Sequence, residues 1–185
     1  MNGSRFDRGV ARAAMKRIFL GLAVWGFLFL IVTATLGYSA NGASMARGQH
    51  MSAGLFTSFF FVLLHSIVFV HLLGTGLGVK RVLFEHKLPA EAVVRRLWRC
   101  KMIAYPPAFS CMVLTIMTAV FGGYLEREGA GSLHFILAVV LLLANIATIW
   151  VEIRMIDENT GIIRDVESSL AALQSTAGSV QRSEA

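Results

Sequence analysis

Four long apolar runs, joined by short polar segments, dominate the pattern along the chain. Each run has about the 17 to 25 residues that a helix needs to cross about 30 Å of hydrocarbon. Helices suit this environment because they satisfy their own backbone hydrogen bonds where lipid offers none. The pattern therefore predicts an all-α fold, a transmembrane four-helix up-down-up-down bundle. Its spans are expected at residues 18–38, 55–79, 102–125 and 133–151.

The segments around these runs predict one domain with short ends. Residues 1–14 are expected to form a cytoplasmic lead, residues 15–172 the four-helix transmembrane domain and residues 173–185 a flexible C-terminal tail. Residues 40–53 are mostly small or polar, so they predict an external loop between the first two helices. The chain is thus expected to build a single core inside the membrane.

Two prolines fall near the start of the third run. Pro106 and Pro107 follow Tyr105. Proline removes a backbone donor and disfavours helix at the residue before it. The sequence predicts that the third helix starts or is interrupted here, after a cytoplasmic link at residues 87–99 that includes a short amphipathic helix.

Charged residues make up 15% of the chain, against an average of about 25% in soluble domains. Their distribution is uneven: 15 of the 17 Lys and Arg residues lie before the first run, between the second and third, or after the fourth. The other two, Arg47 and Arg127, lie in the remaining loops. Cytoplasmic loops of membrane proteins carry an excess of Lys and Arg. The chain is therefore predicted to be a multi-pass protein of the bacterial inner membrane, with both termini in the cytoplasm.

The net charge of +6 does not by itself indicate a nucleic-acid partner. Basic groups beside membrane spans are expected to contact anionic lipid headgroups. Membrane lipids are therefore the expected partners, and other membrane subunits or further copies of the chain stay open. A secretory signal peptide is an alternative for the first run, although its 21 residues exceed the roughly 7 to 15 of a signal peptide's apolar region.

The fourth run carries polar residues on one face. At about 100° per residue, Asn145, Glu152 and Asn159 lie within about 20° of His134 around a helix. Leu141 lies on the same face between His134 and Asn145, which argues against a continuous water-filled path. The polar stripe therefore predicts either interhelical hydrogen bonds or a discontinuous route for protons.

His65 is the central polar residue of the second run. Counting about 1.5 Å per residue from the ends of the runs places His65, Thr33, Met117 and Asn145 at similar depth. These four residues predict one layer near the middle of the membrane, with one residue from each helix. In the first interpretation, His65 is a neutral core residue hydrogen-bonded to Asn145 or a threonine.

The second interpretation makes His65 a metal ligand, the axial ligand of a haem b. Four-helix bundles build cofactor sites from inward-facing residues, and His/Met ligation is one haem arrangement. Met117 is then the expected partner, with His71 and His134 as further candidates. His134 is expected about 13 Å from the level of His65, which argues against that pair.

Glu152 also has two interpretations. It falls at the inner end of the fourth run, where it is expected to pair with Lys80 or Arg81. Alternatively, it belongs to a polar path through the bundle.

Five glycines are candidates for close helix packing. Gly74 and Gly78 form a GxxxG pair, a spacing that lets a neighbouring helix approach. The segment GTGLGVK, residues 74–80, lacks the glycine before lysine of a Walker loop and the strand before a dinucleotide fingerprint, so it does not predict nucleotide binding. The full set is Gly74, Gly76, Gly78, Gly122 and Gly123.

The second helix, with HSIVFVHLLGTGLGVKRV, resembles the HS…GTG…VK segment of a group of bacterial four-helix integral membrane proteins without an established activity. The resemblance continues through YPPAF, FGGYLE, SLHFILAVVLLLANIATIWVE and DENTGII, over residues 60 to 165. It implies four helices and a role for the polar stripe. It implies no reaction.

These observations favour a non-enzymatic accessory or structural membrane subunit with a buried polar layer. A haem b or quinone-interacting redox subunit and a small transporter or proton-conducting protein are the alternatives. The sequence offers neither a nucleophile paired with a base nor two carboxylates within the membrane, so hydrolytic enzymes are not predicted.

Overall fold

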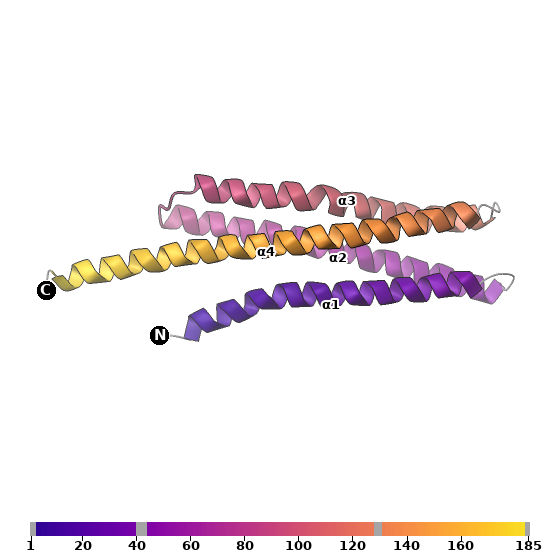
Figure 1. Ribbon diagram of the computed structural model, residues 1–185, viewed down its shortest axis with the longest axis horizontal. Helices are drawn as coiled ribbons and strands as arrows, with labels where there is room; N and C mark the ends of the chain where they lie inside the picture. The colour runs from indigo at the N-terminus through magenta and orange to yellow at the C-terminus, as the bar shows by residue number, and fades with distance from the viewer. Residues whose placement is uncertain (1–2, 40–43, 128–130, 184–185) are drawn as a thin grey trace.

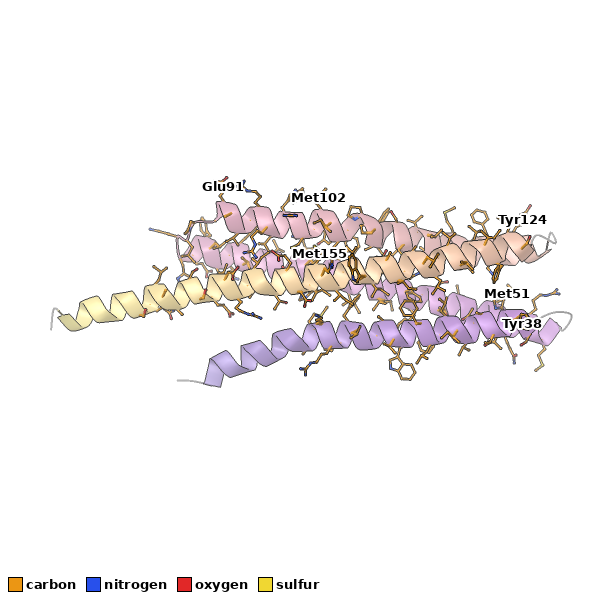
Figure 2. The ribbon with its side chains drawn as sticks, in the orientation of Figure 1. Tyr38, Met51, Glu91, Met102, Tyr124 and Met155 are labelled. Carbon is orange, nitrogen blue, oxygen red and sulfur yellow. The ribbon has the colours of Figure 1, made fainter. Side chains whose placement is uncertain are left out.

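The computed structural model describes residues 3–39, 44–127 and 131–183. Four long helices account for nearly all of them (Figure 1). The start of α1 and the end of α4 lie at one end of the molecule, here named the tail end; Tyr38, Met51 and Tyr124 lie at the opposite end, named the loop end (Figure 2). The helices are α1 (Gly3–Ser39), α2 (Ser44–Glu85), α3 (Glu91–Arg127) and α4 (Gly131–Ser183).

Each helix contains a stretch long and apolar enough to cross a membrane, which confirms the predicted all-helical fold with four candidate spans and indicates an integral membrane protein. Large apolar side chains cover the outside of the bundle, among them Trp25, Phe59 and Trp150. In water such a surface would be costly, whereas lipid accepts it. The chain therefore turns apolar groups both inward and outward.

Three boundaries differ from those expected. α2 begins at Ser44, so most of the predicted loop at 40–53 is helix, and residues 40–43 lie outside the described residues. α4 continues to Ser183, through most of the expected tail. α3 begins at Glu91 and continues through both prolines, so residues 91–99 of the predicted link are the start of one continuous helix.

Tyr105 holds the proline segment of α3 against α2. Its hydroxyl donates a hydrogen bond to the carbonyl oxygen of Phe69, with 3.2 Å between the oxygens, and the two rings stack with centroids 4.2 Å apart. Contacts with a neighbouring helix can compensate for the backbone bonds that proline removes from a membrane helix.

Buried positions recur along the helices at alternating spacings of three and four residues, as in left-handed helix packing. One apolar cluster joins all four helices and includes Phe19, Phe61, Ala104 and Ile149. A second cluster toward the tail end joins α2, α3 and α4. It consists of Val79, Leu83, Leu97, Cys100, Ile162 and Val166.

Ion pairs at the tail end connect α4 to its neighbours. Lys16 of α1 contacts Asp157 with 2.6 Å between nitrogen and oxygen. Arg96 of α3 contacts Glu158 at 2.9 Å and Asp165 at 2.7 Å. These groups are exposed, so each pair adds only about 0–1 kcal/mol to stability.

Candidate functional site

A fully buried polar cluster joins α2 to α4. Nδ1 of His65 lies 3.0 and 3.1 Å from the two carboxyl oxygens of Glu152, and Nε2 lies 3.1 Å from Oδ1 of Asn145. All three residues are 0% exposed. We name this group the His65 cluster.

The lengths of the two helices explain why these residues meet. His65 is 21 residues after Ser44, where α2 begins, and Glu152 is 21 residues after Gly131, where α4 begins. Both helices start at the loop end (Figure 1), so the same number of residues brings both side chains to the same level. Counting from the apolar runs missed this match because α2 starts well before its apolar run.

Asn145 fixes which nitrogen of His65 carries a hydrogen. The amide nitrogen of Asn145 donates to the carbonyl oxygen of Leu141 at 2.9 Å, and a carbonyl oxygen can only accept. The amide oxygen of Asn145 therefore faces His65 and accepts from its Nε2–H group. His65 must hold a hydrogen at Nε2.

One proton remains to be shared between His65 and Glu152. Either Nδ1–H donates to an ionised carboxylate, or the protonated carboxyl donates to Nδ1 of a neutral ring. The pair has no net charge in either form. Such a pair is far less costly inside a membrane than a lone charge.

Asn159 makes a second polar connection between the same helices. Its amide nitrogen donates to the hydroxyl of Thr75 at 2.8 Å, and its side chain is buried. Asn145, Glu152 and Asn159 are each seven residues apart, so they keep one face of α4 toward α2 in left-handed packing. The polar stripe on α4 therefore connects to α2 at two levels.

Apolar groups surround the His65 cluster. The ring of Phe61 stacks on His65 with centroids 6.4 Å apart, and Leu64, Val68 and Ile149 belong to the adjoining core. Each of the three polar side chains is closed off from the surface of the bundle.

Two of the four residues predicted to lie in one layer with His65 and Asn145, namely Thr33 and Met117, lie elsewhere. The hydroxyl of Thr33 lies 2.8 Å from that of Thr57, two turns of α2 away from His65. Met117 is 47% exposed on the outside of α3. The positions were estimated from the ends of apolar runs, which do not coincide with the ends of the helices.

His134 lies near the loop end, beside a histidine that the sequence reasoning missed. The rings of His134 and His50 are 6.1 Å apart, and Nδ1 of His50 donates to the carbonyl oxygen of Thr33 at 2.9 Å. His50 lies in the segment for which the sequence predicts a loop, and only the early start of α2 brings it to His134. His50 is six residues after the start of α2, and His134 is three residues after the start of α4. Both helices start at the loop end, so the two helix starts together place both histidines near that end.

The predicted pairing of Glu152 with Lys80 or Arg81 is also wrong. Glu152 bonds to His65 instead, and Arg81 pairs with Glu85 on its own helix, with 2.9 Å between nitrogen and oxygen. Glu152 lies deep in the bundle because α4 continues far beyond its apolar run. The end of the run therefore does not mark the surface.

The four predicted haem ligands do not fit a haem site. Both nitrogens of His65 are bonded to α4, and Met117 faces outward. His134 packs against α3 near the loop end, and His71 lies about 120° around α2 from His65. Within the described residues, no group of three or more His, Cys, Asp or Glu side chains is placed to hold a metal ion.

The glycines divide into two groups. A Cβ built at Gly122 would lie 2.5 Å from Cε1 of His134, and one at Gly76 would lie 3.0 Å from Nζ of Lys101. At Gly123 the nearest atom would be Cε of Met51, at an ordinary 3.7 Å. Gly74 and Gly78 meet nothing within 4 Å, so the predicted close approach at this GxxxG pair is wrong within the described chain.

We expect Gly74→Ala to raise the free energy of unfolding by up to about 1 kcal/mol, because alanine favours helix over glycine and meets no neighbour here. Unfolding in mixed detergent micelles, followed by loss of helical circular dichroism, measures this change. A clear loss of stability would show that Gly74 packs against another surface.

Comparisons of the chain with family models, curated proteins and solved structures find no match.

Proposed function

We propose that the chain is a multi-pass protein of the bacterial inner membrane with up-down-up-down connectivity and both termini in the cytoplasm. The distribution of Lys and Arg supports this topology. Of the 17 such residues, 15 lie before the first apolar run, between the second and third runs, or after the fourth run. The start of α1 and the end of α4 share the tail end (Figure 1). That end then faces the cytoplasm.

Within the membrane, the chain acts as a non-enzymatic accessory or structural subunit whose polar cluster fixes α2 against α4. The observation that carries this proposal is His65, whose two ring nitrogens both bond to α4 while its side chain is fully buried. Apolar helices slide past one another at little cost in lipid. Directional hydrogen bonds select one axial position.

A second candidate function rests on the shared proton. The His65–Glu152 pair holds one proton that moves between Nδ1 and a carboxyl oxygen without changing the net charge of the pair. Ionisable groups inside membranes commonly mark proton pathways. Leu141 is buried between His134 and Asn145 on the same face, so proton passage would require water to enter there.

A proton-flux measurement separates the two functions. Proteoliposomes with an internal pH dye are given a pH gradient, and wild type is compared with Glu152→Gln and Asn145→Leu. We expect flux equal to that of empty liposomes in all three, while both variants unfold more easily. If the wild type conducted protons and Glu152→Gln did not, the structural role would be rejected in favour of proton conduction.

A further inference from the structure

A groove lies between α2 and α3 at the tail end. It consists of two hollows of about 690 and 130 Å³ that share Lys80 and Val94 in their linings. Lys101, Leu97 and Trp98 complete the lining of the smaller hollow. We name the two together the lysine groove.

Two ammonium groups converge in the lysine groove. Lys80 of α2 and Lys101 of α3 both line the smaller hollow. Gly76, one turn before Lys80, makes room for this approach, because a Cβ at Gly76 would lie 3.0 Å from Nζ and 3.3 Å from Cε of Lys101. The end of the Lys101 side chain thus lies against α2, one turn from Lys80.

Nearby carboxylates do not neutralise these lysines. Glu85 contacts Arg81 and Glu91 contacts Arg95, each at 2.9 Å. Among the described residues, neither Lys80 nor Lys101 forms an ion pair. Two unneutralised cations held together favour binding of an anion with several oxygen atoms.

The surroundings of the groove match a lipid. Lys80 directly follows the apolar run of α2, and Lys101 directly precedes that of α3, so the groove adjoins the ends of two apolar runs. Trp98, 63% exposed, and Phe84, also exposed, flank the groove, and aromatic side chains are enriched at this depth. A charged site beside an exposed apolar surface suits a molecule with an anionic head and acyl chains.

We propose that the lysine groove binds an anionic phospholipid, with its phosphate between Lys80 and Lys101 and its acyl chains on the adjoining apolar surface. Basic pockets between membrane helices on the cytoplasmic side hold such headgroups. The site is separate from the His65 cluster. It requires only that the helices lie in a membrane.

Fluorescence of Trp98 tests the site directly. Trp25→Phe and Trp150→Phe leave Trp98 as the single tryptophan, and both replaced side chains are exposed. The protein is placed in phosphatidylcholine vesicles that contain equal small amounts of either brominated phosphatidylglycerol or brominated phosphatidylcholine. We expect phosphatidylglycerol to be preferred by about tenfold, and Lys80→Gln with Lys101→Gln to abolish the preference.

The matched control is Arg99→Gln with Arg164→Gln, which removes two tail-end charges that line neither hollow and leaves the Arg81–Glu85 pair in place. We expect it to retain most of the preference, with helical circular dichroism unchanged in both double variants. An equal loss of lipid preference in both double variants would show general attraction between a basic protein and an anionic surface, and would overturn the proposed site. Relief of quenching by excess inorganic phosphate would identify a soluble anion as the ligand instead. If neither brominated lipid quenched Trp98, the groove would not contact the bilayer, and the proposal would be overturned.

Discussion

Glu152→Leu is expected to lower the free energy of unfolding by about 3–5 kcal/mol, because it removes one partner of a buried pair and leaves Nδ1 of His65 without one. His65→Leu alone is expected to have a similar effect. The double variant, with both residues replaced by leucine, is expected to recover at least half of the loss, since no polar group of the pair then remains buried. Unfolding in mixed detergent micelles measures all three variants.

Glu158→Gln provides the control for removing a carboxylate from α4. Glu158 pairs with Arg96 at the exposed surface, so the change should cost less than about 1 kcal/mol. Glu152→Gln should lie between the two results, since an amide can still donate to Nδ1 of a neutral His65 ring. Purely additive losses in the double variant would mean that His65 and Glu152 do not interact.

Gly122→Ala is expected to destabilise the bundle by about 1–3 kcal/mol, because the new Cβ would lie 2.5 Å from Cε1 and 2.8 Å from Nδ1 of His134. The imidazole ring must move, and its packing on α3 is lost. The same unfolding measurement reports the effect. Combining Gly122→Ala with His134→Ala should destabilise no more than His134→Ala alone, because the clash is then absent.

Gly123→Ala is the neighbouring control. Its Cβ would meet only Cε of Met51 at 3.7 Å, so we expect no loss and a small gain from the helix preference of alanine. Equal effects at the two positions would contradict the assigned packing of α3 against α4 at Gly122. The pair thus tests the loop end of the bundle separately from the His65 cluster.

The lipid site and the His65 cluster lie at different levels of the same bundle. The cluster joins α2 to α4 deep in the apolar core, whereas the lysine groove opens between α2 and α3 at the tail end. A variant in one is therefore expected to leave the other unchanged. Wild-type lipid preference in Glu152→Gln would support this independence.

The sequence by itself determined the four apolar helices and the shared face of Asn145, Glu152 and Asn159. Both follow from local rules. In a helix, the backbone of each residue is hydrogen-bonded to the residue four positions away, and the number of residues per turn is fixed. The same rules placed His65 inside the second span. These features did not depend on which helices become neighbours.

Only the tertiary structure decided the partners of these residues. His65 meets Glu152 because α2 begins at Ser44 and α4 at Gly131, and apolar runs do not reveal where a helix begins. The approach of Lys101 to Gly76 likewise depends on how α3 packs against α2. The axial position of one helix against another arises from contacts between residues far apart in the chain. Periodicity within either helix cannot specify it.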